Sequence, residues 1–325
     1  MTICLITGIT GFVGSHLAEL LLKEKCEIHG IKRYRSSLEN VAHLQNDIHW
    51  WECDLTDATA VQDMVKKINP DEIYHLAAQS YVPPSWTNPH ATLITNIIGT
   101  LNIFEAVRNL KKNPRILNCS SAEVYGVVQP EECPIKETNP LRPVNIYSLS
   151  KIGQDLLANV YHASYGLDVI TTRAFTHTGP RRNEVFALSS FAKQIAEIEL
   201  GLTEPVVCVG NLDSVRTITD VRDMVKAYRM ALQYCDGGEA YNIGSDQTYS
   251  IRNALNLMLK FTKKEVTIKV DQSRLRPAET PLQIPDSSKF VKKTGWKPEI
   301  PVEKTMKDLL AYWKEKLSNE HCAHA

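Results

Sequence analysis

The chain has 325 residues, of which 37 are lysine or arginine and 37 are aspartate or glutamate, so its formal net charge is zero. Apolar residues make up 43% and charged residues 23%, a globular composition that excludes a disordered or fibrous protein. Zero net charge gives no general attraction to nucleic acid or to an anionic membrane surface, and no apolar run approaches the ~20 residues that cross a bilayer. We therefore expect neither a nucleic-acid partner nor a membrane partner.

The eight cysteines are scattered along the chain without a Cys-x-x-Cys pair. Several lie in strand-like runs, as Cys4 and Cys119 do, where cysteine behaves as a small buried hydrophobe. This usage predicts a reducing, cytoplasmic location, and it favours neither a disulfide framework nor a bound metal.

The first 175 residues alternate short apolar runs with segments whose apolar residues recur at helical spacing. The runs predict strands at residues 3–7, 27–31, 49–53, 72–76, 115–120 and 169–175. The helical spacing predicts helices at residues 15–25, 59–68, 92–109 and 147–165. This alternation predicts an α/β fold, a Rossmann-type doubly wound parallel sheet with helices on both faces.

The pattern changes after residue 175. Residues 185–200 and 220–234 have helical spacing, and residues 206–209 and 240–243 indicate short strands. Asp220 and Ser250 are expected N-caps of helices, and prolines in the segment after residue 250 indicate loops. We therefore predict a dinucleotide-binding domain over residues 1–175, to which 217–244 return, and a smaller α+β lobe formed by residues 176–216 and 245–325.

A glycine-rich segment directly follows the first predicted strand and opens the first predicted helix. Its glycines give Gly-x-x-Gly-x-x-Gly, a variant of the dinucleotide-binding fingerprint. Without side chains the loop can turn tightly, and a pyrophosphate can lie against backbone N–H groups at the helix N-terminus. A plain turn is the alternative. The candidate cofactor-binding residues here are Gly8, Thr10, Gly11, Phe12, Val13 and Gly14.

Cations follow the second predicted strand. Arg33 and Arg35 fall where the adenosine ribose would lie, and cations there favour the 2′-phosphate of NADP over the free hydroxyl of NAD. The sequence therefore predicts NADP as the cofactor, with NAD as the alternative. The non-functional alternative is that these cations only form a solvated basic loop. Further cofactor contacts are expected at the ends of the third and fourth strands, at Asp54, Leu55, Leu76, Ala77 and Ala78.

Tyr147 and Lys151 are four residues apart on a predicted helix, so they share one face. A tyrosine with a pKa of ~10 is a poor base at neutral pH, but a neighbouring ammonium and a cationic nicotinamide favour tyrosinate. We therefore expect Lys151 to lower the pKa of Tyr147, and both residues to contact the cofactor. Ser121 lies at the strand edge where open α/β sheets bind ligands. Glu123 supplies a carboxylate that could act in general acid–base catalysis. The alternative is that Glu123 is a surface residue that closes a turn.

Together these motifs resemble the extended short-chain dehydrogenase/reductase family. Further segments resemble GDP-mannose 4,6-dehydratases and the relatives that act on GDP-manno-heptose or reduce GDP-4-keto-6-deoxymannose. The similarity covers about residues 3–316 and is carried by residues 8–14, 76–80, 121–126, 147–151, 176–182, 209–213 and 276–279.

The resemblance implies a GDP-sugar 4,6-dehydratase. NADP takes a hydride from C4 while Tyr147 takes the hydroxyl proton, Glu123 removes the C5 proton, and the hydride returns to C6 as water leaves. The expected substrate is GDP-D-mannose or a close GDP-manno sugar such as GDP-manno-heptose. Relatives associate through helices equivalent to 92–109 and 147–165, so a homodimer or homotetramer is expected. By family position, the substrate-binding residues are Ser80, Ser121, Thr176, Lys193, Arg216, Arg276 and Glu279.

Two positions depart from the family pattern. Ala122 stands where dTDP-glucose dehydratases carry an aspartate and GDP-mannose dehydratases usually a serine, so Glu123 would serve as base and then as acid. Thr176 stands where the family more often has asparagine, which leaves the sugar open. The alternative function is a GDP-4-keto-6-deoxymannose reductase that uses NADPH, and a third is a catalytically silent NADP-binding sensor.

Overall fold

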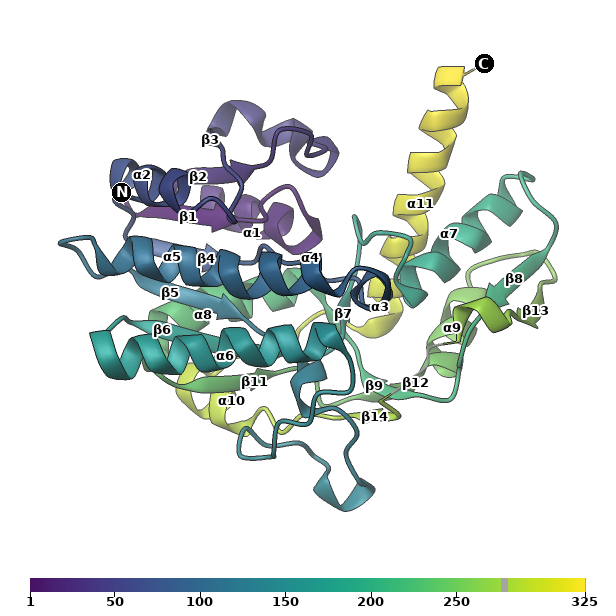
Figure 1. Ribbon diagram of the computed structural model, residues 1–325. Coiled ribbons are helices and arrows are strands. Elements are labelled where there is room, and N and C mark those ends of the chain that lie inside the picture. Colours follow the sequence, from purple (N-terminus) through teal and green to yellow (C-terminus); the bar gives the residue numbers. More distant parts are fainter. Residues whose placement is uncertain (276–279, 325) are drawn as a thin grey trace.

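Figure 1 shows the computed structural model of the protein, which describes residues 1–275 and 280–324. Within these residues the central layer is a sheet of seven parallel strands in the order β11-β6-β5-β4-β1-β2-β3. The strands are β1 (Ile3–Thr7), β2 (Glu27–Lys32), β3 (Ile48–Glu52), β4 (Glu72–His75), β5 (Arg115–Cys119), β6 (Val169–Ala174) and β11 (Ala240–Ile243). The predicted Rossmann-type sheet is confirmed, and each strand predicted before residue 176 forms with ends that differ by one residue at most.

Helices cover both faces of this sheet. On one face α1 (Phe12–Lys23) and α8 (Val221–Tyr234) share an apolar core with β1 and β6. On the other face α2 (Ala58–Ile68), α5 (Gly99–Arg108) and α6 (Ile146–Tyr165) form a second core. Because both faces are covered, most of the sheet strands contain several buried apolar residues in succession, and this pattern is visible in the sequence.

The helix predicted over residues 92–109 is interrupted. It forms as α4 (Pro89–Leu93), a π-helical turn over Ile94–Ile98, and α5. Another difference is the start of α1, which lies at Phe12 because Gly11, in an extended conformation, is its N-cap. The predicted start at residue 15 is therefore too late.

A second lobe lies beside the sheet (Figure 1). Apolar side chains of α7 (Ala187–Glu199), α9 (Ile251–Leu259) and α11 (Val302–His324) form its core. One small sheet has the order β12-β9-β14 and another pairs β13 with β8. These strands are β8 (Val206–Val209), β9 (Val215–Thr217), β12 (Thr248–Ser250), β13 (Thr267–Val270) and β14 (Leu282–Gln283). The remaining elements are α3 (Pro84–Thr87), α10 (Ser288–Thr294) and the 3-10 helices Glu39–Asp47, Ala122–Tyr125, Pro130–Glu132 and Gln272–Arg274.

The chain returns from this lobe to the sheet before ending in the lobe again. After β9, β10 (Thr219–Asp220) pairs with β7 (His177–Thr178), α8 packs on the sheet, and β11 adds an edge strand beside β6. The expected caps are present, because Asp220 accepts a hydrogen bond from the backbone at the start of α8 and Ser250 does so for α9. No helix of the described chain is both long enough and apolar enough for a membrane crossing.

Candidate active site

A cavity of about 1490 Å³ is lined by residues from the carboxyl ends of the sheet strands and from the second lobe. It brings together most of the residues that the sequence singled out. These are Gly8, Thr10, Gly11, Phe12, Val13, Gly14, Arg33, Asp54, Leu55, Leu76, Ala77, Ala78, Ser80, Ser121, Glu123, Tyr147, Lys151, Thr176, Lys193 and Arg216.

One described residue among those predicted, Arg35, is not part of this lining. Arg35 lines a neighbouring cavity of about 550 Å³ that shares Arg33 and Asp54 with the main one. Arg276 and Glu279 lie outside the described residues, so their assignments stay predictions.

The glycine loop is packed so closely that side chains would not fit. Gly8 has a φ of +71°, and a Cβ there would lie 2.9 Å from the backbone nitrogen of Ala77. At Gly14 a Cβ would lie 2.3 Å from the carbonyl oxygen of Gly8. The loop leads directly into α1, so it presents a helix N-terminus with bare backbone to the cavity, which is the arrangement that binds pyrophosphate.

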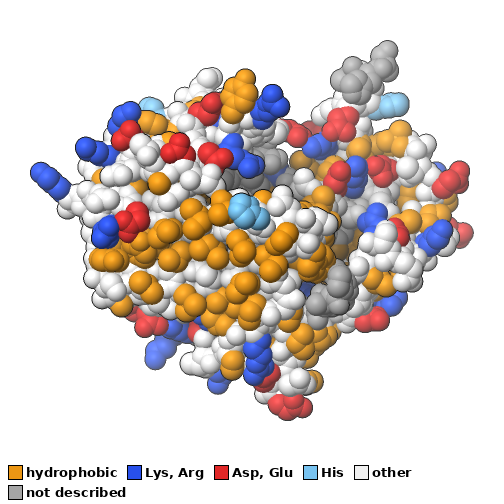
Figure 2. Space-filling model, viewed as in Figure 1, with side chains coloured by type: hydrophobic (Ala, Val, Ile, Leu, Met, Phe, Trp, Pro, Cys, Tyr) orange, Lys and Arg blue, Asp and Glu red, His pale blue; other side chains and the backbone are white. Residues whose placement is uncertain are grey.

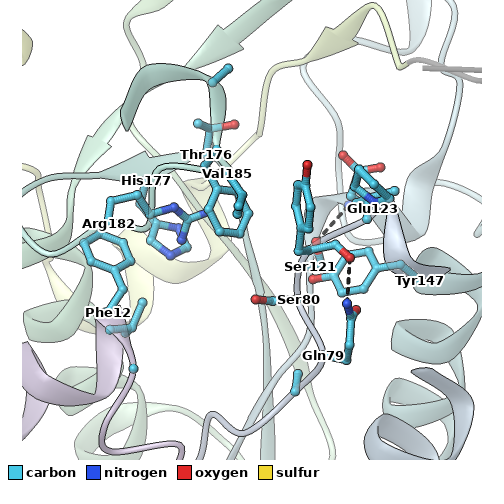
Figure 3. A pocket seen from close by; sticks show the side chains of 18 of the residues that line it. Phe12, Gln79, Ser80, Ser121, Glu123, Tyr147, Thr176, His177, Arg182 and Val185 are labelled. Carbon is cyan, nitrogen blue, oxygen red and sulfur yellow. Dashed lines mark hydrogen bonds between the residues drawn. The ribbon is translucent and has the colours of Figure 1, made fainter. Parts of the chain in front are cut away.

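Ser121, Glu123 and Tyr147 lie on one side of the cavity, opposite Phe12, His177 and Arg182 (Figure 3). Ser121 ends the β5 loop and caps the 3-10 helix that follows, because its hydroxyl accepts a hydrogen bond from the backbone nitrogen of Glu123 at 3.2 Å. Tyr147 comes from the first turn of α6 and is buried. The Ser121 hydroxyl, the Glu123 carboxylate and the Tyr147 phenol therefore line the same side of the cavity. Ser121 and Tyr147 are 26 positions apart in the sequence.

The expected joint effect of Lys151 and a cationic nicotinamide on Tyr147 stays a prediction. Burial raises the pKa of Tyr147 above its ordinary value, opposed by a hydrogen bond with Ser121 and the charge of Arg182. The ammonium of Lys151 is directed elsewhere, because its Nζ donates a hydrogen bond to the carbonyl oxygen of Cys119 at 2.7 Å. Burial also lowers the pKa of Lys151.

Arg182 is a cavity residue to which the sequence could assign no role. Its guanidinium carbon lies 3.5 Å from the ring centroid of Phe186 and 4.9 Å from that of Phe12, and the Phe12 and His177 rings are stacked. Burial lowers the pKa of Arg182 to about 10. No hydrogen bond or ion pair joins this guanidinium to the described residues, so its charge is available to a ligand.

The sequence signal for Arg182 was the pair of adjacent arginines after the Gly-Pro turn. Sequence spacing alone could not tell which of the two faces the cavity. In the structure Arg181 has a φ of +70° and forms an ion pair with Glu19 on α1, so it fastens the loop to the helix. Its neighbour is thereby left to project into the cavity.

The second lobe supplies two of the predicted anion-binding residues. Lys193 lines the cavity but forms ion pairs with Glu184 at 2.5 Å and Glu197 at 3.7 Å, which offset its charge. The guanidinium of Arg216 donates hydrogen bonds to the carbonyl oxygens of Thr280 and Pro281. These contacts hold both cations in place at the cavity wall.

A possible metal-binding group, Glu27, His29 and His49, lies on β2 and β3, away from the cavity. The indole nitrogen of Trp51 donates a hydrogen bond to Nδ1 of His29 at 2.9 Å. The proton of a neutral His29 ring is then on Nε2, which lies 2.9 Å from the Glu27 carboxylate and donates to it. With this nitrogen acting as a donor, the group does not fit a metal ion.

A Rossmann sheet, a glycine loop and a Tyr-x-x-x-Lys pair in one cavity define the extended short-chain dehydrogenase/reductase class. Solved structures of this kind are similar over nearly the whole chain. A Pseudomonas aeruginosa structure, described as RMD complexed with NADPH, has 30% identity and a TM-score of 0.82 and covers 97% of this chain and 98% of its own. A UDP-glucose 4-epimerase from Thermus thermophilus in complex with NAD has 26% identity and a TM-score of 0.85, covering 96% and 99%.

The family model described as GDP-mannose 4,6 dehydratase matches residues 5–309. The chain belongs to this family, which confirms the resemblance. The GDP-mannose 4,6-dehydratase of Yersinia enterocolitica is 35% identical over 347 aligned residues, 94% of this chain and 92% of that protein. The GDP-6-deoxy-D-mannose reductase of Pseudomonas aeruginosa is 31% identical over 315, covering 97% and 98%.

Proposed function

We propose that the protein is a NADP-dependent GDP-sugar 4,6-dehydratase that converts GDP-D-mannose, or a close GDP-manno sugar such as GDP-manno-heptose, to the GDP-4-keto-6-deoxy sugar. The observation that carries the proposal is the meeting of Ser121, Glu123 and Tyr147 at one wall of a cavity that also contains the glycine loop. Oxidation at C4, proton removal at C5 and loss of the C6 hydroxyl need a tyrosinate, a carboxylate and a hydroxyl around one sugar ring.

The residues of the chain divide the work by chemistry. A bound nicotinamide dinucleotide supplies the hydride acceptor and donor. Tyr147 takes the proton of the C4 hydroxyl while Ser121, with which it forms a hydrogen bond, holds the same oxygen. Glu123 removes the proton at C5 and then gives a proton to the leaving hydroxyl at C6, since Ala122 has no proton to donate. Burial raises the pKa of Tyr147, and the hydrogen bond with Ser121 and the charge of Arg182 oppose that rise in part.

The glycine loop fits a dinucleotide, because its glycines let the backbone pack tightly and lead without side chains into the N-terminus of α1. We assign NADP as the cofactor on the basis of Arg33 and Arg35, which line the two adjoining cavities beside Asp54, with NAD as the alternative. In this assignment Lys151 is also a cofactor contact.

The two-part organisation supports the same proposal. Residues 1–175 with 217–244 would bind the dinucleotide, and residues 176–216 with 245–325 would bind the nucleotide sugar. Ser80 and Thr176 would contact the sugar, and Lys193 and Arg216 the nucleotide. Arg276 and Glu279 are proposed contacts by family position. A cytoplasmic location suits the eight cysteines, which are free thiols.

The proposal is tested by incubating the purified protein with GDP-mannose and no added reductant. We expect a keto product that absorbs in alkali, and a Glu123→Gln variant should lose at least ~100-fold in turnover because the acid–base group is gone. The matched control is Gln247→Met, since Gln247 is exposed and outside the cavity lining. Absence of turnover by the wild-type protein overturns the dehydratase.

A specific observation favours the reductase as the second candidate. The reductase alignment covers 97% of this chain in 315 residues, so it needs almost no insertions, whereas the Yersinia dehydratase alignment extends over 347. Ala122, which is buried beside Glu123, also suits a reaction in which Tyr147 protonates the C4 oxygen and no C6 hydroxyl has to leave. Turnover of GDP-4-keto-6-deoxymannose with NADPH, together with inactivity on GDP-mannose, identifies the reductase.

A homodimer or homotetramer is part of the proposal. Figure 2 shows hydrophobic side chains gathered over α4, the π turn and α6. On α6, Leu149, Leu156 and Val160 recur at spacings of seven and four residues, which place them on one helix face, and they are 43%, 53% and 53% exposed. Ile94 and Ile98 continue this helix patch, half-buried. An exposed apolar area of this kind is typical of an interface between subunits.

The oligomer is tested by sedimentation. We expect the wild-type protein to sediment as a dimer or tetramer and the variant L156E/V160E to sediment as a smaller species. Val270→Glu is the control, because Val270 is 55% exposed on β13 but distant in sequence and fold from the patch. A wild-type monomer contradicts the proposal.

A further inference from the structure

Gln283 is the last residue of β14, the short strand that pairs with β9 so that Gln283 is opposite Arg216. Its side chain is 4% exposed and lines the cavity. Nε2 donates one hydrogen bond to Oε1 of Glu123 at 2.9 Å and another to Oγ1 of Thr280 at 3.1 Å. A residue of the second lobe therefore holds a carboxylate that belongs to the sheet layer, 160 positions earlier in the chain.

These hydrogen bonds continue to the nucleotide side of the cavity. Thr280 accepts from Arg216, whose Nη2 lies 2.5 Å from its carbonyl oxygen and 3.3 Å from its hydroxyl. Thr280 thus receives hydrogen bonds from Arg216 and from Gln283, and Gln283 in turn donates to Glu123. The place where the nucleotide is proposed to bind and the place where the C5 proton is removed are joined by three buried or half-buried side chains, Arg216, Thr280 and Gln283.

We propose that Gln283 is a positioning residue for Glu123, an inference that rests on the proposed dehydratase function. An amide NH₂ donates and a carboxylate oxygen accepts, so the contact fixes the rotation of the Glu123 carboxylate. The donor is neutral, and it orients the carboxylate without the strong stabilisation that a guanidinium or ammonium would bring.

The contact also leaves the carboxylate half free. Within the described residues Gln283 is the side chain that hydrogen-bonds to Glu123, and the bond uses Oε1. Oε2 then remains for the substrate. A proton transfer needs the base within hydrogen-bond reach of the carbon-bound proton, so a carboxylate that rotates freely spends less time in the productive geometry.

The test is the variant Gln283→Met, which keeps the length of the side chain and removes the donor. With GDP-mannose and NADP we expect kcat to fall about 10- to 100-fold while KM and the Kd for GDP change by less than about 3-fold. Oxidation at C4 depends on Tyr147 and continues, so reduced nicotinamide should accumulate during turnover and be visible by its absorbance. A residue that only packs β14 would not produce this signal.

A double-mutant comparison sharpens the test. If Gln283 acts through Glu123, the kcat of the variant E123Q/Q283M should be no lower than that of Glu123→Gln alone. If the two residues act independently, the fold-losses in kcat of the two single variants should multiply in the double variant. Gln247→Met is the control for glutamine replacement, and Gln283→Glu, which places a second carboxylate against the first, should lower kcat further than Gln283→Met. The GDP Kd of each variant reports whether the second lobe is intact.

Three outcomes overturn the inference. Wild-type turnover with an unchanged kcat in Gln283→Met, or a loss that is confined to KM and GDP binding, overturns the role of Gln283 alone. No keto product from the wild-type protein overturns the dehydratase function and, with it, this inference.

Discussion

Replacing His75 with asparagine should make the stability of the protein less sensitive to acid. His75 is 1% exposed on β4, where Nδ1 lies 3.0 Å from Oγ1 of Thr7 and Nε2 lies 2.9 Å from Oγ1 of Thr100. Thr100 donates its own proton to the carbonyl of Asn96, so it accepts from Nε2–H of His75. The neutral ring is fully satisfied in this arrangement, and a second proton on Nδ1 would displace the Thr7 hydroxyl.

The magnitude follows from proton linkage. Burial, with a smaller contribution from the charge of Lys151, lowers the pKa of His75 from 6.5 to about 3. Between these values the unfolded chain binds a proton that the folded chain does not, so the free energy of unfolding falls as the pH falls, by ~1.4 kcal/mol per pH unit. From about pH 7.5 to about pH 5 this single group should cost about 2 kcal/mol.

The assay is urea unfolding of wild type and His75→Asn at the two pH values. The variant should be less stable at the higher pH because it loses buried hydrogen bonds, but its decrease on acidification should be smaller than that of wild type by about 2 kcal/mol. His90→Asn is the control, since His90 is exposed at the start of α4. Equal decreases in wild type and His75→Asn would refute the linkage to His75.

Three further predictions concern the cofactor loop and the core. Gly14→Ala places a Cβ 2.3 Å from the carbonyl oxygen of Gly8, so NADP affinity measured by calorimetry should drop at least ~30-fold, and an unchanged Kd would contradict the loop assignment. Arg173→Met leaves the buried Asp155 carboxylate without the guanidinium that lies 2.7 Å away and should lower the unfolding free energy by about 3–5 kcal/mol. The variant D155L/R173M should recover most of that loss, whereas additive losses would argue against the pair. Arg33→Ala should weaken NADP binding ~10-fold more than NAD binding, and equal weakening would mean that Arg33 does not read the phosphate.

The parts that could be predicted from the sequence are those set by local pattern. The sheet strands were found because most of them contain buried apolar residues in succession. The strands of the β12-β9-β14 sheet have only two or three residues each, too few for any periodicity to be detected. The break in the predicted helix over 92–109 is also a local deviation, a π turn at Ile94–Ile98, that apolar spacing does not report.

The candidate site divides in the same way. The glycine loop was predictable because its members are consecutive, and the Tyr147–Lys151 pair because one helical turn joins them. The partner of Lys151 was not predictable, since the carbonyl of Cys119 comes from another strand and only the packing of α6 on the sheet brings it within 2.7 Å. Contacts such as Gln283 with Glu123 depend on how the two lobes meet, and no sequence pattern encodes that distance.

The return of the chain to the sheet limits how such a protein can be rearranged. All six residues of β6 are buried, in part because β11, which follows a long excursion through the second lobe, pairs along its outer edge. A gene fragment that stops after β6 would leave this strand as a bare apolar border, open to pairing with other chains. Recombination could therefore exchange the second lobe only with three separate crossovers, one after β6 and one on each side of the segment that holds α8 and β11. The second lobe is encoded by two separate stretches of the chain. New substrate preferences are therefore more accessible through substitutions at the cavity wall than through replacement of the lobe.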